Sequence, residues 1–474
     1  MAKIHSFFGT VKAVSVSILV MSWSVVLPIA AVADEDDGSL LLSASQVFEM
    51  IEANGDYAID LANADMDIAH ARLAEAGAGL MPRLTLSATS QFYRPSSASY
   101  PDDNAEVYGS LEVVQPIYDF GQTAKAEQAA QKITEAAAFK LLSARNTILL
   151  EGLALFYNLH ASELEIRALY EGHTSAYLGW DRAKENLTLG RASPVDVAKT
   201  LTVTEQTRLA YFRERSRNVG YRLRLEELVG KDLPGELISP PKPPRKKHAD
   251  VNRKAFLAAM WDRNLDLQAL AKQAEGAGLR RDGVGSLPSL NSFANTGYTT
   301  RDLRGRTDYA VGARLSWPIF DGGITRAKKS RLAGEESQMK INFEAKKREL
   351  RRQAIITLLE RDDAYQRVLS ALAGHDYTSK NLLRRQQLYD QERVADLGRA
   401  MIDHTKAEAE LVRATGAYYM VRARIAVLLG EHPKQGLNDE FLGRVIGVED
   451  DQGESFVPKS GTGFGQQDQD QFKK

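Results

Sequence analysis

A phrase that occurs twice constrains the fold of this chain more than any other feature. The letters PIYDFG at 116–121 return as PIFDGG at 318–323. Each copy ends a short stretch that alternates apolar and polar residues, and each begins a long stretch of helix-forming residues. A strand-to-helix junction that occurs twice predicts two copies of one structural unit in the chain.

Other short phrases repeat in the same order. The letters LGRA at 189–192 return at 397–400, and LVG at 228–230 returns as LLG at 428–430, each time before a proline. Because these landmarks keep their order and nearly their spacing, chance similarity is improbable. The predicted repeats span residues 34–230 and 250–430.

Each repeat combines a helix, two short strands and a long helical hairpin. Alternating residues predict strands, and they occur over about 84–93, 107–117, 288–299 and 307–319. Long stretches of helix formers then predict hairpins over about 123–229 and 324–429. The LGRA phrase predicts the turn of each hairpin. After its first copy, Ser193 and Pro194 begin a helix with an acid, Asp196, in the first turn.

The clearest strand pattern lies over 309–317. One face would carry Tyr309, Val311, Ala313, Leu315 and Trp317. An aromatic residue at each end of an apolar band is typical of a strand that crosses a bilayer and faces lipid. A half-buried strand of a soluble sheet shows the same alternation, so the pattern alone leaves both interpretations open.

The first 33 residues have the pattern of a secretory signal. Lys3 and Lys12 accompany an uncharged apolar core, and the letters AVA at 31–33 match a small-x-small cleavage site. An uncleaved N-terminal anchor is the alternative, which the short apolar run disfavours. An exported chain without cysteine cannot use disulfides. Beyond the signal no run of about 18 apolar residues occurs, so a transmembrane helix is not expected.

Charge and composition describe the remaining segments. The 61 Lys and Arg nearly cancel the 62 Asp and Glu, so nothing indicates a nucleic-acid partner. Residues 231–249 are rich in proline and carry a basic cluster at 245–247, which predicts an extended linker. A solvated connector is favoured there over a binding patch. Residues 431–474 form a C-terminal tail that is acidic after about 446, then rich in Gly, Gln and Asp, and this composition predicts that the tail is largely disordered.

Four strands per chain require partners. A closed barrel needs about eight strands, so strands that lie in a membrane must pair their edges with strands of other copies. Long, thin hairpins cannot bury a core alone either. The sequence therefore predicts an obligate oligomer on two separate grounds.

With these features the chain resembles the TolC family of outer-membrane export channels. The resemblance spans 42–430 and rests on the signal, the two repeats, the junctions QPIYD at 115–119 and WPIFD at 317–321, and the turn GRAS at 190–193. It implies a mixed α/β membrane protein in which each repeat supplies two transmembrane β-strands and long coiled-coil helices. It also implies a homotrimer with a 12-stranded β-barrel in the outer-membrane lipid and a periplasmic α-barrel.

The function that the resemblance implies is that of a passive exit channel in a tripartite export system. A periplasmic adaptor (membrane fusion) protein would open the channel, and an inner-membrane ABC or proton-driven transporter would power export. The location would be the bacterial outer membrane, with a periplasmic extension. Small-molecule efflux and type I protein secretion use channels of the same build, so the exported substrate stays open.

The resemblance further implies a periplasmic gate near the hairpin tips. Asp196 lies six residues past Gly190, where the family pattern places a recurrent aspartate; stabilisation of the helix N-terminus is its alternative role. The matching position in the second repeat is His404, with Asp403 one residue earlier, which departs from the family pattern and puts a second acidic ring in doubt. His404 could make a constriction pH-sensitive. The alternative is an exposed histidine on a solvated helix, without a role in a gate.

The tips are also candidates for contact with the adaptor. They are Leu189, Gly190 and Arg191 in the first repeat and Leu397, Gly398 and Arg399 in the second. A glycine that only relaxes the backbone is the alternative, and the two roles are compatible.

No catalytic constellation occurs in the sequence. The chain lacks cysteine, G-x-S-x-G, H-E-x-x-H and a P-loop, so we expect no enzyme activity, no cofactor and no metal site. The rival from another class is a soluble periplasmic coiled-coil scaffold, which would use the hairpins for protein binding alone. The pattern over 309–317 favours the channel, because a scaffold has no use for a lipid-facing band.

Overall fold

The computed structural model of the chain describes residues 42–93, 104–233, 242–244, 251–299, 306–391, 396–438 and 441. Contacts divide the chain into two units, Met1–Leu40 and Leu41–Lys474, and every element below belongs to the second unit. The predicted signal over 1–33, the basic cluster at 245–247 and the tail from 442 onward lie outside the described residues.

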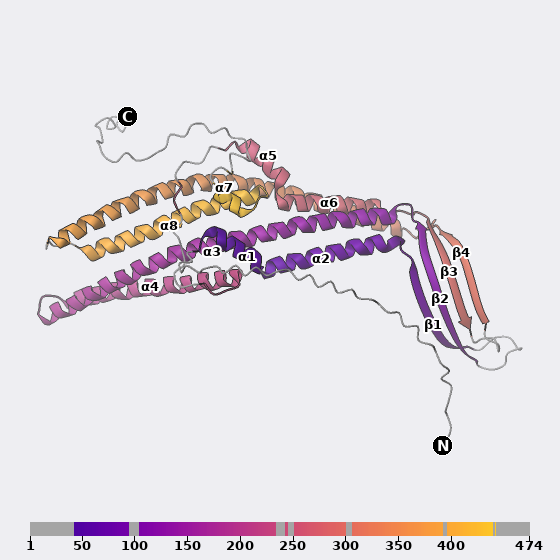
Figure 1. The fold of residues 1–474 in the computed structure, drawn as a ribbon, viewed down its shortest axis with the longest axis horizontal. Coiled ribbons are helices and arrows are strands. Elements are labelled where there is room, and N and C mark those ends of the chain that lie inside the picture. Colours follow the sequence, from indigo (N-terminus) through magenta and orange to yellow (C-terminus); the bar gives the residue numbers. More distant parts are fainter. Residues whose placement is uncertain are drawn as a thin grey trace, which may run out of the picture. The chain divides into compact units, whose positions relative to one another are not determined.

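The second unit is mostly helical with one small sheet, which confirms the predicted mixed α/β class (Figure 1). Its helices are α1 (Ala44–Asn54), α2 (Tyr57–Gly77), α3 (Gln122–Thr188), α4 (Pro194–Val229), α5 (Arg253–Arg263), α6 (Leu265–Asp282), α7 (Ile324–Asp390) and α8 (Leu397–Leu428), with the short 3-10 helices η1 (Ala78–Leu80) and η2 (Pro433–Leu437). Its strands are β1 (Arg83–Tyr93), β2 (Asn104–Tyr118), β3 (Ser289–Thr299) and β4 (Arg306–Ser316). Among the described residues, no helix combines the length and the apolar character needed to cross a membrane.

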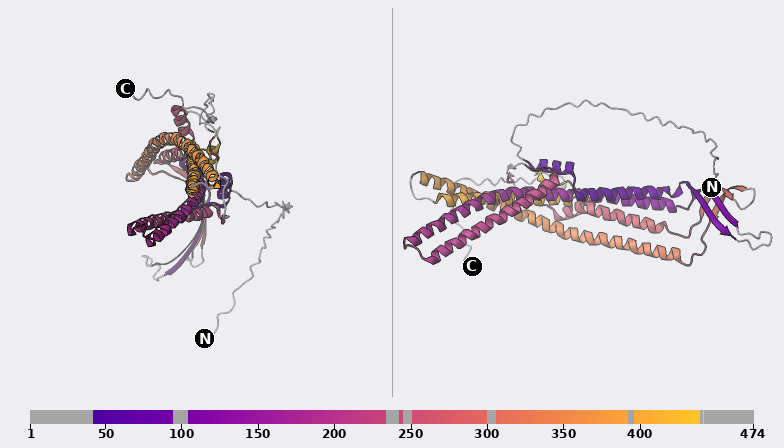
Figure 2. Two further views of the ribbon diagram at one scale, coloured as in Figure 1. Left: turned by 90° about the vertical axis from the view of Figure 1, so that its left-hand side faces the viewer. Right: turned by 90° about the horizontal axis from the view of Figure 1, so that it is seen from below.

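The two longest helices organise the helical part. Helices α3 and α7 have 67 residues each and, at 1.5 Å per residue, are about 100 Å long. Near the sheet α3 packs between α2 and α6, and farther from the sheet it packs between α4 and α8 (Figures 1 and 2). Helix α7 packs against α6 and then α8. The lateral order is therefore α2–α3–α6–α7 near the sheet and α4–α3–α8–α7 beyond it.

The strands form one antiparallel sheet in the order β1-β2-β3-β4. Neighbouring strands pair in continuous register except between Pro116 and Tyr118, where proline has no N–H to donate to the ladder. Strand β2 continues through Tyr118, whereas β4 stops at Ser316. The strand predicted over 307–319 is therefore too long at its end, because Trp317 and the second copy of the phrase lie outside the observed strand. Strands β1 and β4 are the two edges of the sheet.

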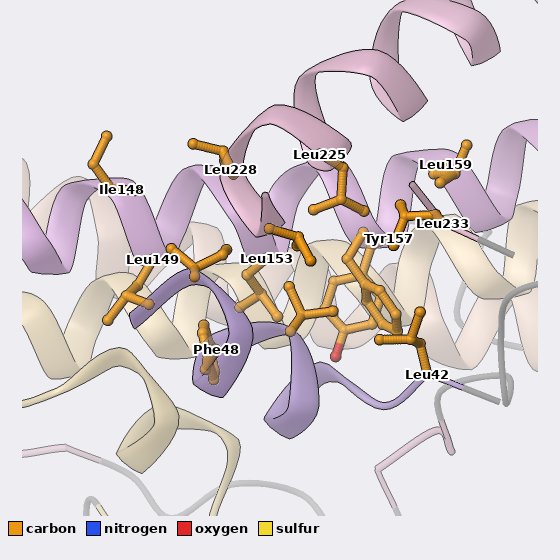
Figure 3. Packing of buried hydrophobic residues seen from close by; sticks show 14 of the residues in the cluster. Leu42, Phe48, Ile148, Leu149, Leu153, Tyr157, Leu159, Leu225, Leu228 and Leu233 are labelled. Carbon is orange, nitrogen blue, oxygen red and sulfur yellow. The ribbon is translucent and has the colours of Figure 1, made fainter. Parts of the chain in front are cut away.

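The larger apolar core lies where α1 crosses α3 and the end of α4. Phe48 of α1 packs with Leu153 of α3 and Leu228 of α4 (Figure 3). Ile51 of α1 belongs to the same cluster, and all four side chains are fully buried. Gly152 allows the close crossing, because a Cβ at this position would lie 2.1 Å from Ile51 Cδ1. The core therefore holds the short first helix across the middle of the long hairpin.

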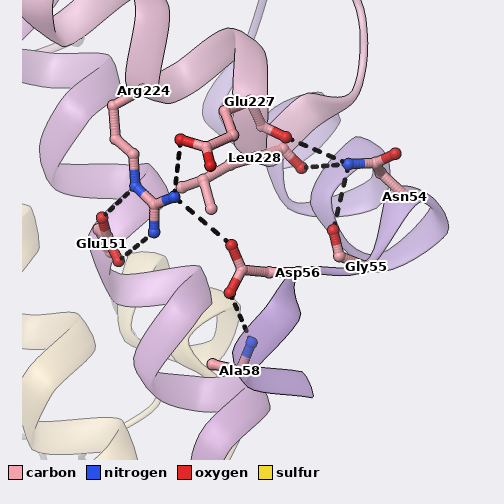
Figure 4. A network of polar contacts seen from close by, with 8 residues as sticks. All are labelled: Asn54, Gly55, Asp56, Ala58, Glu151, Arg224, Glu227 and Leu228. Carbon is pink, nitrogen blue, oxygen red and sulfur yellow. Dashed lines mark hydrogen bonds and ion pairs between the residues drawn. The ribbon is translucent and has the colours of Figure 1, made fainter. Parts of the chain in front are cut away.

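A polar network ties the same helices together. Arg224 of α4 pairs with Glu151 of α3 at 2.8 Å and with Glu227 at 2.9 Å, and lies 3.6 Å from Asp56 (Figure 4). Hydrogen bonds to Glu151 and Glu227 raise the pKa of Arg224. Asp56 also accepts a hydrogen bond from the amide of Ala58 at 2.9 Å and so caps α2. One guanidinium thus links the start of α2 to α3 and α4.

Helix α5 takes the corresponding place in the second repeat. Its Phe256 and Met260 are fully buried and pack with Leu350 of α7 and Ile425 of α8. Phe441, which follows η2, belongs to the same core. The start of the 431–474 tail, which was expected to be largely disordered, therefore holds a short 3-10 helix that packs against α8, and the rest of the tail lies outside the described residues.

The second hairpin turns earlier than the sequence predicts. Helix α7 ends at Asp390, and Leu397, Gly398 and Arg399 form the first turn of α8 instead of the connecting turn. The Asp396 carboxylate accepts a hydrogen bond from the Arg399 amide at 3.1 Å, and this N-cap begins the helix before the LGRA phrase. The assignment of these residues to the turn itself is therefore wrong.

Candidate functional site

One face of the sheet is apolar across all four strands. The register places Leu86 opposite Leu111, Leu111 opposite Thr296, and Thr296 opposite Tyr309. Because side chains alternate between the two faces, the register assigns a common set of exposed apolar residues to this face: Leu84, Leu86, Phe92, Val107, Leu111, Val113, Tyr298, Tyr309, Val311 and Leu315. An exposed apolar surface of this extent marks an interaction with lipid or protein.

The residues predicted to face lipid contribute to this surface. Tyr309 and Val311 are 86% and 81% exposed, and Leu315 is also exposed. Trp317 follows the end of β4, and its indole N–H donates a hydrogen bond to the Ser286 carbonyl at 3.1 Å. Tryptophan residues whose indole N–H makes a hydrogen bond while the ring stays exposed are typical of the boundary between an apolar and an aqueous medium.

The opposite face of the sheet is polar and contains an aromatic residue packed over a glycine. The hydroxyls of Ser87 and Ser110 are 2.7 Å apart. Phe293 covers Gly312, where a Cβ would lie 2.9 Å from the ring, and the Arg314 guanidinium lies 5.0 Å from the centre of the same ring. A ring over a cross-strand glycine pins strand register. Sequence patterns did not indicate this cluster, because its members become neighbours only through the β3–β4 register.

The duplicated phrase begins both long helices in the same way. Asp119 accepts hydrogen bonds from the amides two and four residues later, at 3.1 and 2.6 Å, and Asp321 accepts the equivalent pair at 3.0 and 2.8 Å. Burial opposes ionisation of Asp119, but hydrogen bonds from Thr123 and Gly121 outweigh burial and lower its pKa. Hydrogen bonds from Thr325 lower the pKa of Asp321. The phrase is therefore a helix-starting device.

The backbone of each junction needs two consecutive left-handed residues. They are Phe120 (φ 56°) and Gly121 (φ 85°) in the first copy and Gly322 (φ 63°) and Gly323 (φ 91°) in the second. Phe120 is the only non-glycine residue of the described chain with positive φ, a conformation that costs about 1–2 kcal/mol. The change of direction from strand to helix is thus built into the backbone in both repeats.

The first hairpin tip has the turn that the sequence predicts. Leu189, Gly190 and Arg191 connect α3 to α4 and are exposed. Gly190 adopts φ 71°, and the Arg191 amide donates a hydrogen bond to the Asn186 carbonyl at 2.7 Å. This glycine-based closure of a helix end leaves the tip side chains free for contact.

Asp196 lies at this tip within a capping box. Its carboxylate accepts hydrogen bonds from the Ser193 amide at 2.9 Å and the Ser193 hydroxyl at 2.7 Å, and its amide donates to that hydroxyl at 3.2 Å. The hydrogen bonds from the Ser193 backbone and side chain lower the pKa of Asp196. Asp196 is therefore an ionised, exposed carboxylate that also caps α4.

The second gate candidates lie on α8 and are engaged within their own hairpin. Asp403 pairs with Arg399 at 3.2 Å. The His404 ring packs against His375 of α7 with a centroid distance of 5.1 Å, and its buried Nδ1 has no hydrogen-bond partner. His404 is half-buried, so it is not the fully solvated histidine of the plainer interpretation. Asp196 lies on α4 of the first hairpin, whereas Asp403 and His404 lie on α8 of the second. Asp403 and His404 are therefore neighbours within one chain, and Asp196 is not part of their group.

Within the described ranges, no group of three or more His, Cys, Asp or Glu side chains could hold a metal ion.

Sequence comparison identifies one family. Residues 55–231 match the family model described as outer membrane efflux protein. The curated proteins contain no significant match to the chain.

Solved outer-membrane channels share this fold. The Campylobacter jejuni CmeC outer membrane channel superposes with a TM-score of 0.66 at 16% sequence identity, over 84% of this chain and 89% of that chain. VceC of Vibrio cholerae gives a TM-score of 0.59 at 16% identity, over 82% and 96% of the two chains. The open state of the Neisseria gonorrhoeae MtrE channel gives 0.60 at 15% identity, over 82% and 89%.

The family match and the repeated geometry concern the same elements of the chain. The matched region runs from the start of α2 through the first strand pair and hairpin, and the same element order recurs in the second repeat. The solved structures of this fold named above are outer-membrane channels or proteins of bacteria. The match of residues 55–231 to the outer membrane efflux protein model, the repeated junctions and the superpositions therefore agree: the chain has the fold of these outer-membrane channels.

Proposed function

We propose that the chain is one protomer of a trimeric exit channel that carries the substrate of a tripartite export system across the outer membrane. The observation that carries this proposal is the continuous apolar face of the sheet. Each strand has at least 11 residues, enough for a tilted strand to cross a hydrocarbon core of about 30 Å. The apolar face would meet lipid and the polar face would line the lumen.

The two edges of the chain support a ring of identical copies. Strand β1 with α2 and α4 forms one edge, and β4 with α7 forms the other. Because the edges differ, the β4–α7 edge of one copy would meet the β1–α2–α4 edge of the next, and such a head-to-tail contact can close into a ring. Three copies of four strands exceed the roughly eight strands that a barrel needs.

The proposal includes the segments into which the chain is divided and the proteins with which it would act. A cleaved signal (1–33) would precede the repeats 34–230 and 250–430, joined by the linker 231–249. The partners would be a periplasmic adaptor at the hairpin tips and an inner-membrane ABC or proton-driven transporter that supplies the energy. Small-molecule efflux and type I protein secretion are both compatible with this geometry.

Fractionation and conductance test the proposal. The expressed full chain is expected in the outer-membrane fraction, released only by detergent, as a trimer that conducts ions in planar bilayers. Recovery of a detergent-free soluble protein without conductance would instead support the periplasmic coiled-coil scaffold. The exposed apolar sheet face argues against that scaffold, because water would meet it directly.

The gate is proposed at the hairpin tips, with Asp196 as the first candidate and Asp403 and His404 as the second pair. Asp196→Ala and Ser193→Ala both break the capping box, but only the first removes a carboxylate. If the carboxylate helps to close the pore, Asp196→Ala raises single-channel conductance and Ser193→Ala does not, while both lower the melting temperature. Equal conductance in the two variants would leave Asp196 with a capping role alone.

A further inference from the structure

The junction between β4 and α7 exposes apolar side chains as far as the start of the helix. Trp317, Ile319 and Phe320 follow the strand, and Ile324 is the first residue of α7. Their side chains are between 61% and 90% exposed. Because these residues follow directly on β4, apolar side chains continue from the sheet to the helix start. An exposed apolar surface of this kind marks a contact with lipid or protein.

Three cations lie within the first two turns of α7. Arg326, Lys328 and Lys329 are exposed, and none of them has an ion-pair partner among the described residues. Lys329 lies five residues past Ile324, so the three cations lie within about 8 Å of the helix start along its axis. We call these three cations and the four apolar residues before them the junction surface.

The start of α7 has no acid of its own to balance these charges. Residues 324–334 contain none, and the first acid of the helix is Glu335. Arg326 and Lys329 are three residues apart, which makes them neighbours on the helix surface, and like charges at this spacing repel each other. Farther along α7, Lys340 pairs with Glu336 at 2.7 Å. The chain thus supplies a counter-charge to Lys340 but none to the cations at the helix start.

The first junction has a similar backbone but lacks these cations. Helices α3 and α7 have 67 residues each and begin in the same way, and the corresponding positions of α3 hold Ala124, Ala126 and Glu127. The cation in the first two turns of α3, Lys125, donates a hydrogen bond to the Asp282 carbonyl at 3.0 Å. A helix start of this design therefore does not require free cations, and the cluster is a property of the second junction.

The depth of the junction surface corresponds to a layer of lipid headgroups. The hydrocarbon core of a bilayer is about 30 Å thick and the whole bilayer about 40–45 Å, which leaves about 5–8 Å for each headgroup layer. When the apolar face of the sheet spans the core, cations within about 8 Å of the helix start lie at the level of the lipid phosphates. Aromatic residues at the boundary and cations just beyond it are typical of this layer.

We infer that the junction surface binds the headgroup of an anionic phospholipid in the leaflet that adjoins the helices. The inference rests on the proposed function, because the sheet must span the membrane for this surface to reach the headgroups. A phosphate without an ammonium group beside it, as in phosphatidylglycerol, supplies the missing counter-charge, whereas the zwitterionic headgroup of phosphatidylcholine has no net charge to supply. Each cation near an anionic membrane surface contributes a factor of about five in affinity.

Lipid titration of the full chain in a neutral detergent tests the inference. Native mass spectrometry, with phosphatidylglycerol and phosphatidylcholine as the two probes, gives the apparent Kd for each lipid. We expect the unsubstituted protein to prefer phosphatidylglycerol by at least about tenfold. The variant Arg326→Gln/Lys328→Gln/Lys329→Gln should reduce this preference to within about twofold. The charge-conserving variant Arg326→Lys/Lys328→Arg/Lys329→Arg should keep it.

A later part of α7 provides the matched control. Arg348, Arg351 and Arg352 are also exposed, but they lie about 30 Å or more beyond the junction cations along the helix and therefore outside the headgroup layer. The variant Arg348→Gln/Arg351→Gln/Arg352→Gln removes the same charge and should retain the preference for phosphatidylglycerol. Equal loss in the two glutamine variants would show a general attraction between anionic lipid and the cations of α7, and would overturn the inference.

The outcomes separate this inference from the proposed function. Loss of the lipid preference in the junction variant alone would establish the site. An unchanged preference in that variant would overturn the inference, and a shorter half-life of its trimer would assign the junction surface to the next copy instead. An unsubstituted protein that conducts as a trimer but shows no lipid preference would overturn the inference and leave the channel standing. A soluble protein without conductance would overturn the channel and the inference together.

Discussion

Asn264 gives a quantitative test of how the middle of the helical unit is held. It lies between α5 and α6 and is buried. Its Oδ1 accepts a hydrogen bond from the Leu267 amide at 3.2 Å and caps α6, while its Nδ2 donates to the Leu428 carbonyl at 3.1 Å. Asn54 of the first repeat donates to the Leu228 carbonyl at 3.1 Å in the same way, but Asn54 is exposed (Figure 4).

The structure predicts different costs for the two asparagines. Asn264→Ala removes an N-cap worth about 1 kcal/mol and leaves a buried carbonyl without its donor at about 1–3 kcal/mol, so the free energy of unfolding should fall by about 2–4 kcal/mol. Asn264→Ser retains a capping hydroxyl and should lose only the second contribution. Asn54→Ala exposes its carbonyl partners to water and should cost about 1 kcal/mol.

Urea unfolding of the detergent-solubilised protein, followed by far-UV circular dichroism, measures these differences. The midpoints should fall in the order Asn54→Ala, Asn264→Ser, Asn264→Ala, with unchanged slopes. Equal midpoints for Asn264→Ala and Asn54→Ala would refute the argument from burial. Equal midpoints for Asn264→Ser and Asn264→Ala would show that the cap contributes nothing.

Three further predictions concern the sheet face, the junctions and acid pH. Val311→Lys, in the middle of β4 on the apolar face, should destabilise the protein in the membrane by about 2–4 kcal/mol and remove it from the outer-membrane fraction. Ala310→Lys, on the polar face, should leave the amount of protein in that fraction unchanged. Equal losses for the two variants would contradict the assignment of the faces. Gly322 adopts φ 63°, so Gly322→Ala should lower the free energy of unfolding, measured from the urea midpoint, by about 1–2 kcal/mol. Gly374 lies inside α7 with open space around it, so Gly374→Ala should raise the free energy of unfolding by about 0.5–1 kcal/mol. Shifts of the same sign would refute the backbone explanation. Because the pKa of Asp119 is lowered in the fold, its ionised form stabilises the protein at pH values above the ordinary carboxyl pKa of about 3.9, and this contribution is lost as pH falls through the lowered pKa. Asp119→Asn should therefore flatten the acid limb of a stability–pH curve, and an unchanged limb would show that ionisation of Asp119 does not stabilise the fold.

Local signals in the sequence predicted the parts of the fold that depend on neighbouring residues. Alternation located the strands because the period of two is a property of each strand alone. The repeated phrase located both helix starts because Asp119 and Asp321 bond amides only two and four residues away. The same logic explains the error at the second tip, where another local cap, Asp396, begins α8 before the repeated LGRA phrase.

Local sequence patterns could not predict contacts between segments that lie far apart in the chain. The burial of Phe441 depends on the core formed by α5, α7 and α8, which no property of the tail reveals. The cluster of Phe293, Gly312 and Arg314 exists only because β3 and β4 pair in one register.

The duplication also bears on how the proposed ring closes. Six hairpins would surround the axis of a trimer, and two neighbouring hairpins of each chain already pack through α3 and α8, where Glu165 and Arg413 pair. Covalent linkage makes that contact intramolecular, so it costs no association entropy. Only the contact between α7 and the α4 edge of the next copy must form between molecules. Specificity is therefore needed at this edge more than inside the chain.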